Sequence, residues 1–320
     1  MASLQEVLGY AVKHGASDIH LCVGSPPACR IDGKIRFFGD ENLTPEKTGI
    51  YLDEILDDKH RKQFVETGDT DVALSIAGLG RFRVNCLMQR SSVGIIMRHV
   101  KGKILPFEEL NLPKTLETIA MTRRGLCLVT GTTGSGKSTT LAAIIDHINR
   151  NRREHIITLE DPIEFLHQNK KALITQREIT IDTEDFKTAL RAAMREDPDV
   201  ILIGEMRDSE TFGASMSAAE TGHLVFSTLH TTNAMLTIDR IMDMFPPEQH
   251  HQVRSQLSLQ MRYTVAQRLL PMADGRGRVA AVEIMQNSPA IAALIRENEL
   301  KQIPNAIAAG RDDGMQSFNM

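Results

Sequence analysis

Residues 131–138, Gly-Thr-Thr-Gly-Ser-Gly-Lys-Ser, constrain the fold of this chain more than any other segment. They match the pattern G-x-x-x-x-G-K-[ST] and follow an apolar run at residues 126–129, which is typical of a buried strand. A helical segment rich in alanine and isoleucine begins near Thr139. A strand, a glycine-rich loop and a helix in this order form a phosphate-binding loop, because backbone N–H groups and the helix N-terminus then face one anion. We therefore predict an α/β domain that binds a nucleoside triphosphate.

The loop supplies two side chains with separate tasks. Lys137 is expected to reach the β- and γ-phosphates of ATP, and the Ser138 hydroxyl is expected to complete the coordination shell of Mg²⁺. The glycines let backbone N–H groups turn toward the phosphates. The residues predicted to bind the nucleotide are Gly131, Thr132, Thr133, Gly134, Ser135, Gly136, Lys137, Ser138 and Thr139.

The composition argues against several other classes of protein. At 320 residues the chain is long for one hydrophobic core and suits two domains. A net charge of −4 gives no strong basic field for nucleic acid or an anionic membrane. The four cysteines form no C-x-x-C pair, and the N-terminus shows no secretion signal. No apolar run approaches the roughly 18 residues that span a bilayer, so we expect a cytoplasmic protein.

The first domain, residues 1–98, is predicted to be α+β with a mainly antiparallel sheet. Apolar residues repeat at helical spacing over residues 3–14, and residues 45–66 also have a helical pattern. Short alternating segments separated by turn residues predict strands at residues 18–21, 28–31, 34–37, 70–76, 80–89 and 93–100.

Residues 99–113 contain Pro106 and Pro113 and are predicted to be a linker. In the second domain, residues 114–320, strands alternate with helices, which favours a parallel sheet covered on both faces. The expected strands are residues 126–130, 155–159, 200–204 and 223–228, and the expected helices are residues 137–149, 183–195 and 209–220. We expect residues 247–320 to be mostly helical, with a hairpin-like turn at residues 274–277.

Two acidic residues follow predicted strands of the second domain. Glu160 comes directly after residues 156–159, and Glu205 comes after residues 200–204. The carboxyl ends of parallel strands meet at one edge of a sheet, so both carboxylates could face the phosphate-binding loop. ATP hydrolysis needs one carboxylate near Mg²⁺ and another that orients or deprotonates the attacking water. The apolar run before Glu205 favours a Walker B role there, whereas Glu160 by itself could equally be an ordinary loop residue.

Two histidines, His223 and His230, flank another predicted strand. Seven residues of extended chain place them on opposite faces and more than about 20 Å apart, so they cannot bind one metal ion together. His230 lies at the expected carboxyl end of the strand and is the better candidate to sense the γ-phosphate.

Four segments resemble the motif series of one ATPase superfamily. They are the phosphate-binding loop (Walker A), residues 159–165 (Asp box), residues 195–208 (Walker B) and residues 219–231 (His box). In this order they resemble the type II/type IV secretion ATPase superfamily, and within it the PilT-type type IV pilus retraction ATPases. The resemblance also covers residues 16–20, 81–85, 309–310 and 314–316. It therefore extends over nearly the full chain.

The resemblance implies a homohexameric ring of two-domain subunits, each with an N-terminal PAS-like domain and a C-terminal RecA-like ATPase domain. ATP and Mg²⁺ would bind between the two domains, and nucleotide exchange would rotate one domain against the other. It further implies mechanical work on an inner-membrane platform protein at the base of the pilus, with the ring peripheral on the cytoplasmic side. A paralogous pilus ATPase is a further candidate partner, and no nucleic acid is expected.

The resemblance also assigns catalytic roles to the acidic residues and the histidines. Glu160 would activate the attacking water, and Glu205 would lie near Mg²⁺, although an exchange of these two roles stays open. His230 and His223 would couple the γ-phosphate to neighbouring elements.

Arginines of the first domain form a third group with an implied role. Arg83 and Arg98 match the spacing of the family's phosphate-reaching arginines, and Arg81 is a further candidate. Without the resemblance, all three would be interpreted as ordinary solvated strand residues. In other enzymes a cationic group at a transferring phosphoryl group accelerates the reaction by about 10³–10⁵.

One departure and three alternatives remain. This chain has Ala292 where the family often has an arginine, which puts a role of that arginine in retraction or partner contact in doubt. An assembly ATPase would usually carry a four-cysteine metal module, but no cysteine follows Cys127 in this sequence. The motifs do not separate a retraction motor from an accessory paralogue. A nucleic-acid motor would need basic stripes or aromatic platforms, and only 4% of the residues are aromatic.

Overall fold

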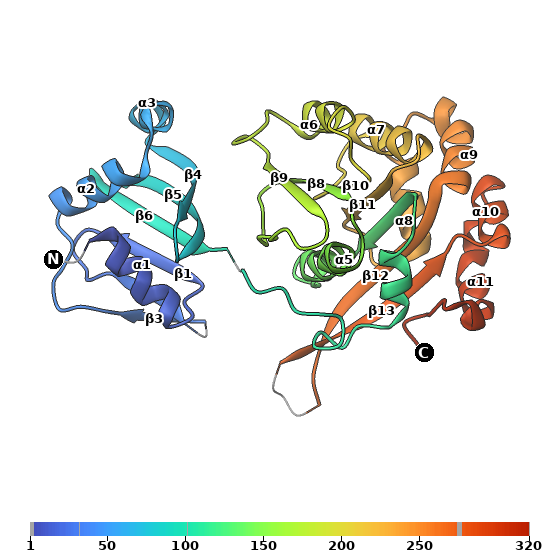
Figure 1. The fold of residues 1–320 in the computed structure, drawn as a ribbon, viewed down its shortest axis with the longest axis horizontal. Coiled ribbons are helices and arrows are strands. Elements are labelled where there is room, and N and C mark those ends of the chain that lie inside the picture. Colours follow the sequence, from blue (N-terminus) through green and yellow to red (C-terminus); the bar gives the residue numbers. More distant parts are fainter. Residues whose placement is uncertain (1–2, 32, 101, 274–276, 320) are drawn as a thin grey trace. The chain divides into compact units, whose positions relative to one another are not determined.

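Two compact units, Met1–Gly102 and Lys103–Met320, make up the chain (Figure 1). The structure, a computed structural model, describes residues 3–31, 33–100, 102–273 and 277–319. The division falls inside the predicted linker, and residues 103–113 belong to the second unit. Phe107 and Leu112 of this segment are buried in the core of the second unit. This part of the predicted linker is therefore packed chain.

The first unit combines helices with an antiparallel sheet. In chain order its elements are α1 (Leu4–Lys13), β1 (Asp18–Cys22), β2 (Ala28–Ile31), β3 (Lys34–Phe37), α2 (Pro45–Ile55), α3 (Asp58–Thr67), β4 (Asp69–Ile76), β5 (Gly80–Gln89) and β6 (Ser92–His99). The strands lie in the order β3-β2-β1-β6-β5-β4, and each neighbouring pair is antiparallel. The predicted strands are confirmed. The helical segment predicted at residues 45–66 is two helices, because Leu56 has an extended backbone and the Asp57 carboxylate caps α3.

Strand β5 shows how alternation places polar residues on one face of this sheet. Phe82, Val84 and Cys86 are buried in the core of the first unit. Because successive side chains of a strand point to opposite faces, Arg81 and Arg83 lie on the other face. The sheet thus has an apolar face toward the helices and a face that carries cationic residues.

The second unit is built on a mainly parallel sheet. Its strands are β7 (Gly125–Thr130), β8 (His155–Glu160), β9 (Leu173–Glu178), β10 (Val200–Ile203), β11 (Leu224–Leu229), β12 (Met261–Pro271) and β13 (Arg278–Gln286). Its helices are α4 (Thr115–Ala120), α5 (Lys137–Asn151), α6 (Phe186–Ala193), α7 (Ser209–Glu220), α8 (Ala234–Met242), α9 (His250–Gln260), α10 (Pro289–Arg296) and α11 (Ile303–Ala309). The strand order is β13-β12-β7-β11-β10-β8-β9, and only the β12–β13 pair among these described strands is antiparallel.

The central strands of this sheet are covered on both faces. Every residue of β7, β10 and β11 is buried, and separate apolar clusters pack on the two sides of the sheet. Such burial explains why these strands are continuous apolar runs in the sequence. The phosphate-binding loop leaves the carboxyl end of β7, near the middle of the sheet, and leads into α5.

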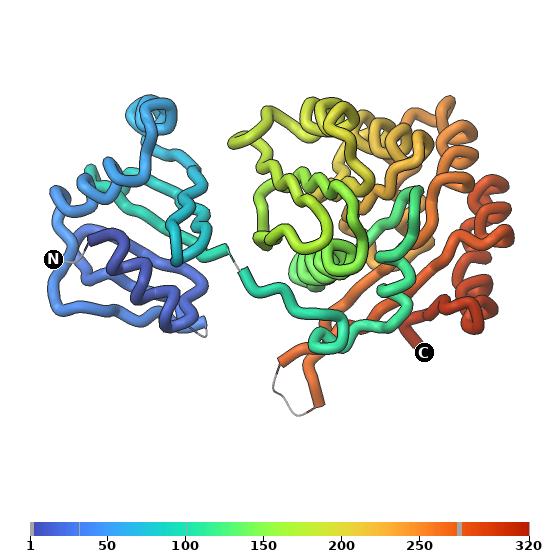
Figure 2. Tube along the Cα trace, in the orientation of Figure 1, coloured from blue at the N-terminus to red at the C-terminus, as the bar shows by residue number. Residues whose placement is uncertain are grey.

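The prediction of a mostly helical segment at residues 247–320 is wrong. Strands β12 and β13 pair over nine residue positions and add a long hairpin to the sheet. Helix α9 ends at Gln260 and β12 starts at Met261 with neither glycine nor proline between them, so the sequence gives no boundary signal there. Residues 274–276 of the predicted turn lie outside the described residues. Helices α9, α10 and α11 pack in sequence along the side of the second unit (Figure 2).

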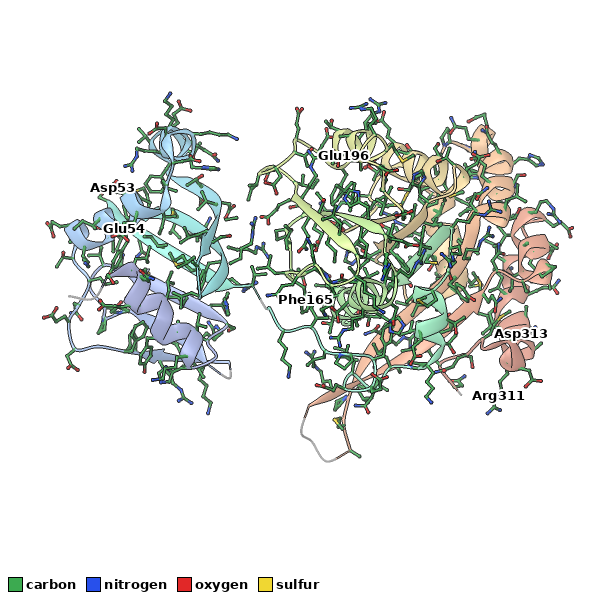
Figure 3. All side chains as sticks on the ribbon, in the orientation of Figure 1. Asp53, Glu54, Phe165, Glu196, Arg311 and Asp313 are labelled. Carbon is green, nitrogen blue, oxygen red and sulfur yellow. The ribbon has the colours of Figure 1, made fainter. Side chains whose placement is uncertain are left out.

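Strand β9 is a second element that the sequence pattern does not indicate. It pairs in parallel with β8 at the edge of the sheet and ends in polar residues, so it lacks the apolar run of a central strand. The segment between β8 and β9 carries Phe165 (Figure 3). Among the described helices, none has the length and apolar character needed to cross a membrane.

Candidate nucleotide-binding site

The phosphate-binding loop has the backbone that its glycines allow. Gly131, Gly134 and Gly136 have φ angles of 150°, 77° and 92°, which other residues rarely adopt. A Cβ atom on Gly131 would lie 2.4 Å from the Ser135 Oγ, and one on Gly136 would lie 2.7 Å from the Gln267 Nε2. Both positions therefore exclude a larger residue because of space as well as backbone conformation.

Lys137 is the first residue of α5 and is buried at the base of this loop. Its Nζ donates hydrogen bonds to the carbonyl oxygens of Gly131, at 2.8 Å, and Thr132, at 3.1 Å. Burial lowers the pKa of Lys137, while the charges of Glu205 and Glu164 act in the opposite direction. The carboxylates thus help to keep a buried ammonium group charged beside the loop.

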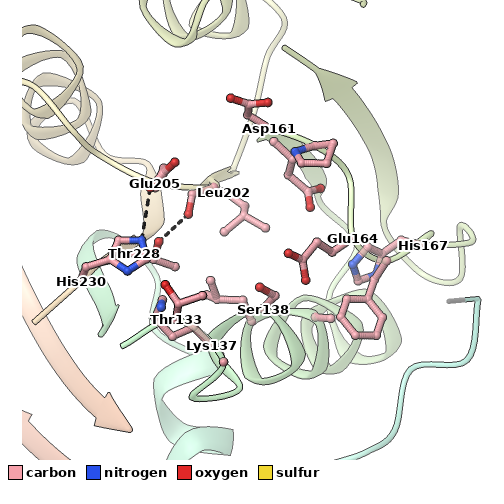
Figure 4. A pocket seen from close by; sticks show the side chains of 17 residues that line it. Thr133, Lys137, Ser138, Asp161, Glu164, His167, Leu202, Glu205, Thr228 and His230 are labelled. Carbon is pink, nitrogen blue, oxygen red and sulfur yellow. Dashed lines mark hydrogen bonds and ion pairs between the residues drawn. The ribbon is translucent and has the colours of Figure 1, made fainter. Parts of the chain in front are cut away.

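The loop and the neighbouring strand ends enclose a cavity of about 220 Å³ (Figure 4). Its walls come from the loop, the start of α5 and the segments that follow β8, β10 and β11. The side chains around it include Thr133, Lys137, Ser138, Glu160, Asp161, Glu164, Phe165, His167, Glu205, Thr228 and His230. The structure therefore brings together the three strand ends that the sequence predicts to converge.

This cavity has the chemistry of a phosphate site. The N-terminus of the 15-residue helix α5 opens toward the loop and carries a partial positive charge. The Ser135 hydroxyl is buried and has no hydrogen-bond partner among the described residues. A cationic side chain, a helix N-terminus and backbone turned by glycines fit a phosphate group.

Glu160 is the last residue of β8 and is held by two neighbours. Its Oε1 accepts hydrogen bonds from the Thr158 hydroxyl at 2.7 Å and from the Gln176 amide at 3.3 Å. Burial raises the pKa of the Glu160 carboxyl, although these two hydrogen bonds act in the opposite direction. A fixed carboxylate with a raised pKa is suited to accept a proton.

Glu205 follows β10, and its carboxylate has Arg207 and His230 as neighbours. One carboxylate oxygen forms an ion pair with Arg207, and the other lies 3.4 Å from the His230 Nε2 (Figure 4). The Glu205 side chain is mostly buried, whereas that of Arg207 is largely exposed. The pair His230–Glu205 joins the end of β11 to the end of β10 at the cavity.

The two histidines lie at opposite ends of β11. His230 lines the cavity, whereas His223 precedes the amino end of the strand, where its Nδ1 lies 2.9 Å from the carbonyl oxygen of Ala218. His223 borders a different cavity, with Arg152 and Glu154. The second unit thus places His230 with the acidic residues and does not place His223 there.

The sequence analysis assigns no role to four residues at or next to this site. Glu164 and His167 line the cavity, and burial lowers the pKa of His167 to about 4. Both belong to the segment after β8, so closeness to Glu160 is the signal that could have indicated them. Gln176 and Gln267 come from β9 and β12, two strands that the sequence does not predict, and no sequence signal points to them.

The three predicted arginines belong to the first unit. Arg83 on β5 and Arg98 on β6 are opposite each other in the register of the sheet, and Arg81 lies two residues before Arg83 on the same face. The Arg98 Nε donates a hydrogen bond to the Asp18 Oδ1 at 2.8 Å. The structure therefore gathers these cationic residues on one face of the first sheet.

Asp18 is a buried carboxylate that orients Arg98. Its Oδ2 accepts a hydrogen bond from the Ser17 hydroxyl at 2.8 Å. Burial raises the pKa of the Asp18 carboxyl, but the hydrogen bonds from Arg98 and Ser17 outweigh burial and hold this pKa below its ordinary value. Asp18 is thus charged at neutral pH and fixes the guanidinium of a side chain that is otherwise 64% exposed.

Comparison with known proteins identifies the family. A family model described as "Type II/IV secretion system protein" matches residues 1–316. The chain belongs to this family. The "Type IV pilus retractation ATPase PilT" of Pseudomonas aeruginosa is 48% identical to this chain over 317 residues, 99% of this chain and 92% of that protein. The "Type IV pilus ATPase PilU" of the same organism is 40% identical, over 98% of this chain and 82% of that protein.

A solved structure of the pilus retraction motor PilT with bound ADP matches this chain with a TM-score of 0.91. The two share 48% sequence identity, and the match covers 96% of this chain and 90% of that one. The predicted superfamily and fold class are confirmed: the second unit is a RecA-like α/β ATPase domain, and a smaller domain precedes it. The PAS-like character of that smaller domain stays a prediction.

Proposed function

We propose that this protein is an ATPase that converts ATP hydrolysis into mechanical work for type IV pilus retraction, the process that drives twitching motility. The observation that carries the proposal is the convergence of Lys137, Glu160 and Glu205 on one cavity next to a phosphate-binding loop. The relative named as a retraction ATPase, which matches along 99% of this chain, supports the process assigned to that chemistry.

Nucleotide binding rests on the loop and the start of α5. Residues 131–139 would surround the phosphates with backbone N–H groups, and the Lys137 ammonium would move from its carbonyl partners to the β- and γ-phosphates. ADP in the solved structure of a retraction motor supports this placement. Since the Lys137 side chain is already held at the base of the loop, little side-chain entropy is lost on binding.

The residues present also fit Mg²⁺. Among the described residues, no group of three or more His, Cys, Asp and Glu side chains could hold a metal ion by itself. Mg²⁺ commonly binds through one or two protein oxygens together with nucleotide phosphates and water. The Ser138 hydroxyl and the Glu205 carboxylate, both on the cavity wall, would be these protein groups. Bound Mg²⁺ would neutralise charge that develops on the phosphoryl oxygens.

Glu160 is the proposed base for the attacking water. Its raised pKa makes the carboxylate a stronger proton acceptor than an exposed glutamate, and Thr158 and Gln176 fix its direction. His230 would sense the γ-phosphate through its contact with Glu205. The role of His223 in coupling to neighbouring elements would be exerted at the amino end of β11, away from the phosphate.

The arginines of the first unit are proposed to complete the site. Arg83, Arg98 and Arg81 would contact the phosphates when the two domains close on the nucleotide. Closure driven by ATP requires contacts that are better in the closed state, and a row of cationic side chains supplies them. The hydrogen bond from the Arg98 Nε to Asp18 restricts the orientation of the Arg98 guanidinium.

The proposed assembly is a homohexameric ring on the cytoplasmic side of the inner membrane, at the base of the pilus. Its proposed partners are the inner-membrane platform protein and a paralogous pilus ATPase, and the proposal includes no nucleic acid. Full-length similarity to a retraction ATPase and to its relative PilU supports these partners.

Deletion of the gene in its host tests the proposal, with surface pili and twitching scored together. Abundant pili without twitching are expected for the loss of a retraction motor. Cells without pili would contradict retraction and indicate an assembly motor. Complementation with the wild-type gene and with a Glu205→Gln variant separates loss of the protein from loss of its chemistry.

The chain matches two pilus ATPases of one organism, PilT and PilU, along almost its whole length. One second candidate is therefore an accessory ATPase that works beside another motor. It predicts normal pili and twitching after deletion, and a defect that appears when the partner motor is weakened. A strain with a partially active partner motor would therefore distinguish the two functions.

A further inference from the structure

Gln267 is a buried polar residue in the middle of β12, 132 residues after Ser135 of the phosphate-binding loop. Its side chain amide makes two hydrogen bonds, both buried. The Nε2 donates to the carbonyl oxygen of Ser135 at 2.8 Å, and the Oε1 accepts from the Thr140 hydroxyl at 2.7 Å. One amide thus joins the end of the phosphate-binding loop to the first turn of α5.

These two contacts lie on either side of Lys137, the residue proposed to bind the phosphates. Ser135 and Thr140 lie on either side of Lys137 in sequence, so Gln267 fixes the chain immediately before and after it. A Cβ atom on Gly136 would lie 2.7 Å from the Gln267 Nε2, and one on Gly131 would lie 2.5 Å from the Gln267 carbonyl oxygen. The loop is therefore packed against both the side chain and the backbone of Gln267.

The chemistry of an amide suits this position. A backbone carbonyl can only accept and Thr140 donates here, so the partner must offer both a donor and an acceptor, which the uncharged amide of glutamine does. Removal of the amide would leave a buried carbonyl and a buried hydroxyl without their partners. The loop would then relax toward other partners and lose the conformation that faces a phosphate.

The same hairpin also touches the loop that follows β11 and carries His230. The Glu283 Oε1, on β13, accepts a hydrogen bond from the backbone N–H of Ala234 at 2.8 Å. The Arg268 Nη2, on β12, donates to the carbonyl oxygen of Thr232 at 3.4 Å. The β12–β13 hairpin thus contacts both the phosphate-binding loop and the loop that follows β11. Gln267 makes the contact with the phosphate-binding loop.

We propose that Gln267 is a positioning residue for nucleotide binding, which holds the phosphate-binding loop and the start of α5 in the conformation that receives the phosphates. It acts through Ser135 and Thr140 and does not itself touch the nucleotide. This proposal rests on the proposed ATPase function, since a loop without a nucleotide would have nothing to position.

The test compares three variants of the full-length protein with the wild type. Gln267→Met keeps the length of the side chain and removes both hydrogen bonds, and Thr140→Val removes one of them. Thr264→Val is the matched control, because Thr264 is a fully buried residue of the same strand whose hydroxyl donates to the Met261 sulfur instead of the loop. Each protein is assayed for ADP affinity by calorimetry, for KM and kcat with ATP, and for Tm with and without ADP.

We expect Gln267→Met to weaken ADP binding about tenfold, because a buried donor and acceptor lose their partners. The KM for ATP should rise in parallel while kcat changes less, since binding of substrate and transition state suffer alike. Thr140→Val should show a smaller loss, and Thr264→Val none. The double variant Gln267→Met/Thr140→Val should bind no more weakly than Gln267→Met, because both act through one contact.

A folded Gln267→Met protein with wild-type ADP affinity and KM but a lower Tm would overturn the proposal, since Gln267 would then only stabilise the fold. If Gln267→Met does not fold, Thr140→Val decides: weaker ADP binding supports the proposal, and unchanged binding refutes it. Failure of the wild type and of Thr264→Val to bind ADP or ATP would instead refute the proposed ATPase function.

Discussion

The two ends of the parallel strands in the second unit hold similar residues in different arrangements. At the carboxyl ends, Lys137, Glu160 and Glu205 point into one cavity. At the amino ends, the buried Arg152 pairs with Glu154 at 2.6 Å and donates to the carbonyl oxygens of Thr122 and Ala120. Arg152 and Glu154 also border a cavity, but they form an ion pair with each other, whereas Lys137, Glu160 and Glu205 converge on one cavity beside a phosphate-binding loop, where charged groups are available to a ligand. The carboxyl end is therefore the chemical end of this sheet.

The largest expected effect comes from the ammonium group at the chemical end. We expect Lys137→Ala to weaken ADP and ATP binding by about 10³-fold or more, because a preorganised cation at the phosphates is lost. Calorimetric titration with ADP measures the loss. Lys187→Ala, which removes only a surface ion pair with Glu210, is the matched control. Wild-type ADP affinity in Lys137→Ala would contradict the assignment of the nucleotide site to the carboxyl ends of the strands.

Next in size is the loss of one carboxylate at the same end. We expect Glu205→Gln to keep nucleotide binding and lower the rate of ATP hydrolysis by about 10²–10³-fold, since Glu205 would hold the Mg²⁺ that neutralises charge on the phosphoryl oxygens. Single-turnover hydrolysis beside an ADP titration separates the two quantities. Glu160→Gln in the same assay shows which acid activates the water, and hydrolysis at the normal rate in Glu205→Gln would show that this residue has no catalytic role.

At the amino ends of the strands, removal of a charged side chain should lower the stability of the fold and leave ADP binding unchanged. We expect Arg152→Met to lower the free energy of unfolding by about 3–5 kcal/mol, because the mostly buried Glu154 carboxylate loses its closer partner and keeps only the exposed Arg123, 3.7 Å away. Urea denaturation measures the loss, and Glu154→Gln in the same background should restore part of it. Weakened ADP binding in a protein of normal stability would mean that this end also serves the nucleotide.

The smallest effect is a shift in the pH dependence of turnover. Because the pKa of Glu160 is raised, the acidic limb of kcat should lie at a higher pH than that of an ordinary glutamate, with about a tenfold fall per pH unit below it. Stability changes with pH in the opposite direction to kcat. Burial favours the protonated form of Glu160, so its contribution to the free energy of unfolding is present at low pH and is lost as pH rises through its folded pKa. A kcat profile that stays flat down to the ordinary glutamate range would exclude Glu160 as the base.

The sequence predicts the chemical end well because short segments define it. The loop around Lys137 is contiguous, and Glu160 and Glu205 each follow a strand whose apolar run is visible in the sequence. Parallel strands bring such residues together whatever lies between them. The prediction of this convergence does not require the order of the strands in the sheet.

The remaining features depend on long-range contacts that no local pattern records. Gln267 reaches the loop from β12, which begins at Met261 directly after a helix without a boundary residue. Gln176 reaches Glu160 from an edge strand of polar character. The placement of His223 outside the cavity follows from the length of β11, which the spacing of the two histidines does predict.

The packing of residues 103–113 into the second unit shortens the connection between the two units. Val100 is buried in the first unit and Phe107 in the second, so the span between these anchors is seven residues at most. A cut of the chain meant to leave the core of each unit whole therefore has to fall within residues 101–106.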